Sequence, residues 1–105
     1  MRRAPSILLL FVLTLTLGVL AGCSRDPNVR KQKYYESGQR YFEKNKFREA
    51  AIQYSNAIQV DPRFSDAHYR LGLTYLRLGE PNRAYQELQR TVELVVEHEL
   101  ARFGH

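Results

Sequence analysis

Residues 35–41 read YESGQRY, and 34 positions further along the chain residues 69–75 read YRLGLTY. Both stretches begin and end with tyrosine and carry glycine in the middle. The same offset places Ala50 against Ala84, which extends the match beyond the quoted stretches. A larger side chain at these small residues would push two touching helices apart. Self-similarity at one fixed period predicts that a single structural unit occurs twice in this chain.

Apolar and small side chains recur three and four positions apart throughout the last two-thirds of the chain. This spacing is typical of helices that turn one face toward a core. The pattern is interrupted at KNK (44–46), at Asp61-Pro62, and at Gly79 followed by Pro81, which are residues that end or begin helices. No alternating run or Asn-Gly turn indicates a strand. The sequence therefore predicts an all-α domain of four helices joined by very short turns.

The periodicity, the turns and the internal match together resemble the tetratricopeptide repeat, a helix–turn–helix unit of about 34 residues. The resemblance implies two tandem helix–turn–helix hairpins, a fragment of an α-solenoid, after an N-terminal signal helix. We expect the first unit at residues 31–64 and the second at 65–98, with 99–105 irregular or frayed. The alternative is two unrelated amphipathic hairpins. The matching positions are Tyr34, Gly38, Tyr41, Ala50, Tyr54, Ala57 and Pro62 in the first unit, and Leu71, Gly72, Tyr75, Ala84 and Leu88 in the second.

Tetratricopeptide arrays bind protein partners on an inner face that is lined by the first helix of each hairpin. The resemblance implies such a groove here, of mixed polarity, which suits an extended or helical peptide. Phe42, Leu73 and Leu76 could equally be core side chains. The positions that correspond to the family's groove are Gln32, Tyr35, Gln39, Phe42 and Glu43 in the first unit, and Asp66, Tyr69, Leu73, Leu76 and Arg77 in the second.

The chain opens with two arginines and then an apolar stretch, ILLLFVLTLTLGVL, at residues 7–20. This stretch is shorter than the roughly 20 residues of a spanning helix, and it matches the core of a signal peptide. The adjoining LAGC at residues 20–23 resembles the bacterial lipoprotein signal. The resemblance implies a signal peptide at 1–22, cleavage before Cys23 and a covalent lipid on the Cys23 sulfur.

Cys23 is the single cysteine, so no internal disulfide can form and thiols are too few for a zinc site. Residues 23–30 include a proline and an asparagine and lack apolar periodicity, which predicts a short tether. Several acyl chains would hold the domain at a bilayer durably. We therefore expect the protein to be located in the bacterial cell envelope. Ser24, directly after the cysteine, favours the outer membrane facing the periplasm in a Gram-negative host.

The charge pattern argues against a nucleic-acid-binding module. Lys and Arg total 16 against 11 Asp and Glu, a net charge of +5, but both signs are mixed along the repeat region. A nucleic-acid surface would carry a stripe of basic residues on one face.

The spacing of potential catalytic residues also predicts that the protein is not an enzyme. His68, His98 and His105 are scattered, and there is no acid–His–nucleophile set, metal-binding spacing or phosphate-binding glycine loop. His68 takes an aromatic packing place of the second unit, so we interpret it as a core histidine. The sequence predicts no catalytic residue, no metal and no cofactor apart from the lipid on Cys23.

We therefore interpret the chain as a membrane-anchored scaffold lipoprotein that mediates protein–protein interaction in the bacterial envelope. Family members of this shape suggest export, pilus or exopolysaccharide assembly as the setting. One alternative is an uncleaved signal-anchor protein whose helices oligomerise. Another is a truncated piece of a longer array, because about three repeats are usually needed for stability. Self-association or missing repeats would explain why Val92, Leu94, Val95 and Val96 make the last helix apolar on more than one side.

Overall fold

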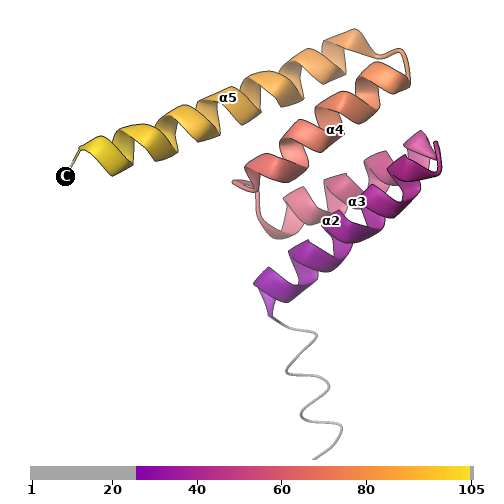
Figure 1. The fold of residues 1–105 in the computed structure, drawn as a ribbon, viewed down its shortest axis with the longest axis horizontal. Coiled ribbons are helices and arrows are strands. Elements are labelled where there is room, and N and C mark those ends of the chain that lie inside the picture. Colours follow the sequence, from indigo (N-terminus) through magenta and orange to yellow (C-terminus); the bar gives the residue numbers. More distant parts are fainter. Residues whose placement is uncertain (1–25, 105) are drawn as a thin grey trace, which may run out of the picture.

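The computed structural model describes residues 26–104, which form four helices and no strand. Figure 1 shows two helical hairpins in succession, with the second helix of the first hairpin packed on the first helix of the next. This arrangement confirms the predicted all-α fold of two tandem hairpins. Among the described residues, every helix is too short or too polar to cross a membrane. The helices are α2 (Pro27–Glu43), α3 (Phe47–Val60), α4 (Ser65–Arg77) and α5 (Pro81–Phe103).

The turns inside the two hairpins have the same geometry. Asn45 and Gly79, which are 34 residues apart, adopt left-handed backbone with φ of 61° and 73°. One residue later, the Lys46 N–H donates to the Tyr41 carbonyl and the Glu80 N–H to the Tyr75 carbonyl, each at 2.9 Å. Glycine and asparagine tolerate this backbone region better than other residues do. The repeat predicted from side chains is therefore present in the backbone as well.

The core lies where the two hairpins meet. Ala50 and Tyr54 of α3 and Leu71 of α4 form a buried cluster, against which Ala51, Ile58 and Tyr75 pack. A Cβ added to Gly38 would stand 2.6 Å from Cε1 of Tyr54, and one added to Gly72 would stand 2.8 Å from Cδ2 of Leu88. Tyr54 and Leu88 are themselves repeat-equivalent. The paired glycines thus allow the two helices of each hairpin to approach closely.

His68 is buried at 7% exposure and links α4 to α5 and to the turn between the hairpins. Its Nδ1 lies 2.6 Å from the Glu87 carboxylate of α5, and its Nε2 lies 2.8 Å from the Pro62 carbonyl in the turn before α4. Both ring nitrogens of this buried imidazole therefore have a partner. The location agrees with the interpretation of His68 as a core histidine.

Two of the predicted boundaries are wrong. Residues 27–30, expected in the tether, form the first turn of α2, because the Asp26 carboxylate accepts a hydrogen bond from the Asn28 N–H at 3.0 Å and Pro27 suits the first helical position. Residues 99–103, expected to be irregular, continue α5. Glu, Leu, Ala and Arg there are all good helix formers. Residues 1–25, which include the predicted signal peptide, the predicted lipoprotein signal and Cys23, lie outside the described residues, as does His105.

Candidate functional site

The ten predicted groove residues lie on α2 and α4, the first helices of the two hairpins. Helical periodicity places each set of five on one face of its helix, since successive spacings of three, four, three and one residues keep them within roughly 100° of one another. Six are exposed and four are half-buried. The exposed six are Gln32, Glu43, Asp66, Tyr69, Leu76 and Arg77, and the half-buried four are Tyr35, Gln39, Phe42 and Leu73.

Tyr35 is mainly a packing residue. Its ring centroid lies 5.8 Å from that of Tyr54 and 5.2 Å from that of Phe64, which stands at the start of α4. Lys31 completes this end of the interface, with its ammonium 4.9 Å from the Phe64 ring centroid and 2.7 Å from a carboxylate oxygen of Asp61. These contacts join α2 to the turn between the hairpins, and they leave Tyr35 half-buried.

Phe42 and Arg77 are brought together by a residue that the groove prediction did not include. The Phe47 ring lies 5.2 Å from Phe42, edge-on at 76°, and the Arg77 guanidinium carbon lies 5.8 Å from the Phe47 centroid. Phe47 is the first residue of α3, so these three side chains join the two hairpins near their turns. Phe47 appears in the sequence as one member of an amphipathic stripe, and no local signal distinguishes it.

The available apolar surface of the predicted groove is concentrated on α4. Tyr69 and Leu76 are 46% and 51% exposed, and half-buried Leu73 lies between them at spacings of four and three residues. The repeat-equivalent residues on α2 are Tyr35, Gln39 and Phe42, of which two are packed and one is polar. The two halves of the groove therefore differ, with an apolar stripe on α4 and polar groups on α2.

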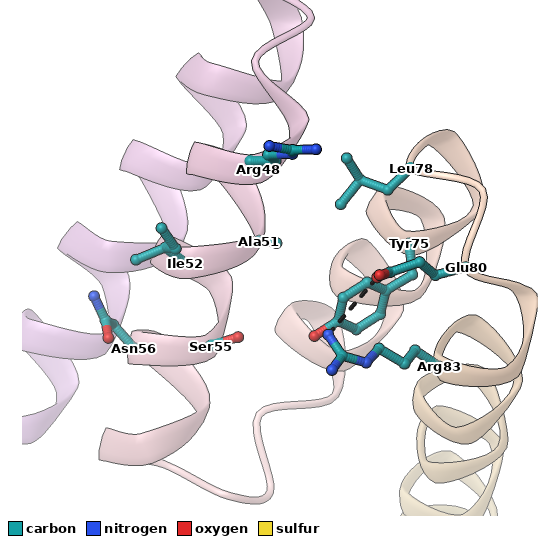
Figure 2. Close-up of a pocket in the computed structure, with 9 residues that line it drawn as sticks. All are labelled: Arg48, Ala51, Ile52, Ser55, Asn56, Tyr75, Leu78, Glu80 and Arg83. Atoms are coloured by element: carbon teal, nitrogen blue, oxygen red, sulfur yellow. Dashed lines mark ion pairs between the residues drawn. The ribbon is translucent and has the colours of Figure 1, made fainter.

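A separate cavity of about 440 Å³ lies between α3 and the turn that joins α4 to α5. Figure 2 shows Ile52 and Ala51 on one side of it and Tyr75 and Leu78 on the other. Arg83 sits at the rim, 3.7 Å from Glu80, with its guanidinium carbon 5.6 Å from the Tyr75 ring centroid. Sequence reasoning missed this cavity because its lining residues come from three helices, α3, α4 and α5, and from the turn between the last two.

The cavity and the predicted groove occupy different faces of α4. Tyr75 lies two residues from Leu73, and two residues correspond to roughly 200° of rotation around a helix. Helix α4 therefore separates a ligand bound in the cavity from one bound in the predicted groove.

The described residues contain no group of three or more side chains placed to hold a metal ion. Asp61 has the pKa of its carboxyl lowered by the hydrogen bond from Lys31, with further help from the Arg63 N–H. That carboxylate accepts hydrogen bonds within the turn between the hairpins, which gives it a structural role. The chemistry available on these faces is recognition by packing, hydrogen bonds and charge.

Comparison with known proteins gives one family match. Residues 38–79, from Gly38 in α2 to Gly79 after α4, match the model described as TPR repeat. The chain is 34% identical over 75 residues to the human protein O-mannosyl-transferase TMTC3, a match that covers 70% of this chain and 8% of that protein. The chain thus corresponds to a small part of that relative's length, and no solved structure matches it. The described residues are an all-α solenoid fragment that contains a tetratricopeptide repeat.

Proposed function

We propose that this chain is a scaffold that binds a polypeptide segment across the face formed by α2 and α4. The observation that carries the proposal is the apolar stripe on α4, where the exposed side chains of Tyr69 and Leu76 flank half-buried Leu73. Scaffolding is also what a tetratricopeptide repeat suggests, because such repeats generally mediate protein–protein interaction.

The chemistry of the face suits a peptide with alternating apolar and polar groups. Tyr69 provides a large contact area with few rotatable bonds, so that ordering it costs little entropy. Gln32, Gln39 and Glu43 on α2 can hydrogen-bond to the main chain of an extended segment. Asp66 and Arg77, near opposite ends of α4, carry opposite charges that would orient the bound segment along the helix.

A displayed library of random peptides, screened against the full-length chain, tests this binding face. Peptides selected by the wild-type chain should lose at least about tenfold in affinity for a Tyr69→Ala, Leu76→Ala double variant. Ile52→Ala is the matched control, because Ile52 is 58% exposed but lines the separate cavity. A loss with Ile52→Ala and none with the double variant would move the binding site to that cavity and overturn the proposal.

We further propose that the scaffold is lipid-anchored in the bacterial envelope through Cys23, after removal of residues 1–22. The support is the basic start, the short apolar core and the LAGC match at 20–23. Because α2 begins at Pro27, four residue steps separate it from Cys23, a reach of at most roughly 14 Å. The α2 end of the solenoid would then lie close to the bilayer, on the outer membrane facing the periplasm in a Gram-negative host.

The intact mass of the protein from bacterial membranes tests the anchor. Residues 23–105 plus acyl chains are expected, and Cys23→Ser should abolish both processing and acylation. An unprocessed mass near 12.3 kDa would instead support the uncleaved signal anchor. Roles in export, pilus or exopolysaccharide assembly rest on family resemblance, and any partner found through the α2–α4 face would test them directly.

We propose no catalytic activity for this chain. The name of the human relative describes a transferase, but the similarity covers 8% of that protein. The described residues contain no arrangement of nucleophile, base and acid that would perform such a reaction.

A further inference from the structure

Helix α5 carries a continuous apolar face that nothing in the described chain covers. It is 23 residues long, whereas α4 has 13 residues. Figure 1 shows the yellow C-terminal half of α5 extending past the N-terminal end of α4. The exposed fractions of its apolar side chains run from 48% at Val95 to 79% at Phe103. The exposed set is Tyr85, Val92, Val95, Val96, Leu100 and Phe103.

This face is the repeat-equivalent of one that a helix covers in the first hairpin. Subtracting the repeat length from Tyr85 and Val92 gives Ala51 and Ile58 of α3. Both pack against the core cluster of Ala50, Tyr54 and Leu71, the last of which comes from α4. The exposed face of α5 therefore continues the kind of helix–helix interface already present between α3 and α4.

The spacing of the apolar residues along this face is symmetric about position 94. Tyr85, Val92, Val96 and Phe103 are separated by 7, 4 and 7 residues, with Leu94 at the midpoint. Seven and eleven residues are about two and three helical turns, so these four side chains form one narrow stripe. Leu94 lies on the opposite side of the helix and is buried at 4% exposure against its own chain.

Such a stripe is self-complementary when two copies of the helix run antiparallel across a two-fold axis near Leu94. Tyr85 then meets Phe103 of the second copy, and Val92 meets Val96. In this register aromatic faces aromatic and aliphatic faces aliphatic within the stripe.

Charge selects this orientation over the parallel one. Among the charged residues between positions 86 and 102, Glu99 lies closest to the stripe, because the others are turned roughly 80° or more away from it around the helix. In the antiparallel register Glu99 meets Gln89, whose amide can donate to it. In a parallel pair, Glu99 would instead face Glu99 of the second copy.

We propose that α5 forms an antiparallel homodimer with a second copy of this chain, through Tyr85, Val92, Val96 and Phe103. The two-fold axis passes near Leu94. The predicted α2–α4 face remains free in both copies, so a dimer would present two peptide-binding faces. The dimer does not depend on the proposed peptide binding.

Disulfide trapping of the full-length chain in membranes of expressing bacteria tests the pairing and its direction. Val92→Cys and Val96→Cys chains are co-expressed, with the wild-type chain as control for Cys23. The mixed 92–96 disulfide should form several-fold faster than either homodisulfide, because those two positions face each other. Predominant homodisulfides would indicate parallel pairing and overturn the proposal, as would a disulfide to an unrelated protein or no cross-link at all.

Sedimentation of the detergent-extracted chain gives the second readout. Val96→Arg should weaken dimerisation at least about tenfold, since it places a charge at the centre of the stripe. Ala101→Arg adds the same charge at an exposed position on the side of α5 opposite the stripe and should leave the dimer intact. Circular dichroism checks that both variants keep their helices. A wild-type chain that sediments as a monomer, or an Ala101→Arg effect as large as that of Val96→Arg, would overturn the proposal.

Discussion

The ring of Tyr54 occupies the space in which a side chain on Gly38 would begin, with Cε1 of the ring 2.6 Å from the position of an added Cβ. Tyr54 is 0% exposed and belongs to the core cluster with Ala50 and Leu71. The contact between α2 and α3 therefore depends on one missing Cβ and on one ring that has little freedom to move.

Gly38→Ala should lower the free energy of unfolding. Overpacking against the Tyr54 ring costs about 1–3 kcal/mol, which exceeds the gain of about 1 kcal/mol that alanine brings to a helix interior. Urea unfolding measures the difference. Gly72→Ala is the matched control and should cost less, because its neighbour Leu88 is only half-buried and has rotamers available. A larger loss at Gly72 would contradict this account.

Tyr54→Phe should raise the free energy of unfolding by about 1 kcal/mol. No described residue forms a hydrogen bond with the buried Tyr54 hydroxyl, and an unsatisfied buried polar group costs about 1–3 kcal/mol. Urea unfolding near neutral pH measures the gain. Tyr41→Phe, at a half-buried position, serves as control and should change stability less. A loss of stability in Tyr54→Phe would mean that the hydroxyl has a partner in the folded protein.

Alkaline pH should destabilise the wild-type chain through the same residue. Burial raises the pKa of Tyr54 from 10.0 to about 12, with a smaller opposing effect from Arg70. Because the folded-state pKa lies above the unfolded one, the free energy of unfolding is unaffected by this group below pH 10. It falls as the pH rises from 10 toward 12, since the unfolded chain loses the Tyr54 proton first. Unfolding of the wild type and Tyr54→Phe across this range should therefore show a steeper loss for the wild type. Equal slopes would contradict the prediction.

The ion pair of Lys31 and Asp61 should contribute modestly to the free energy of unfolding, and this contribution should depend on salt. Their side chains are 24% and 31% exposed at a distance of 2.7 Å, and part-exposed ion pairs contribute about 0–1 kcal/mol. A double-mutant cycle with Lys31→Met and Asp61→Asn measures the coupling, which added salt should reduce. A coupling that is large and insensitive to salt would show that the pair is more shielded than its exposure indicates.

Acid should remove the Asp61 contribution. The Lys31 hydrogen bond holds the pKa of Asp61 below its usual 3.8. Since this folded-state pKa is depressed, the contribution is present above pH 3.8 and is lost as the pH falls through the lower folded-state value. Asp61→Asn should lack that part of the acid loss, which unfolding curves below pH 4 can resolve.

The sequence by itself determined the helices and their order, because the signals involved are local. Pro81 can begin a helix without losing a hydrogen bond, and Gly79 can adopt the left-handed turn before it. Equivalent pairs such as Gly38 and Gly72 then predicted the register of the two hairpins, since their distance along the chain does not depend on tertiary contacts. The end of α5 was missed because residues 99–103 resemble no repeat, although the first four of them favour a helix.

Only the tertiary structure decided which side chains remain available to a partner. Tyr35 and Tyr69 occupy the same place in the repeat, yet Tyr35 is half-buried against Tyr54 and Phe64 whereas Tyr69 is 46% exposed. Phe42 and Arg77 meet only through Phe47, which belongs to a third helix. Exposure of a side chain depends on what its neighbours in space leave uncovered, and those neighbours come from distant parts of the chain. The sequence pattern is the same for a covered and an uncovered residue, so only the packed fold distinguishes them.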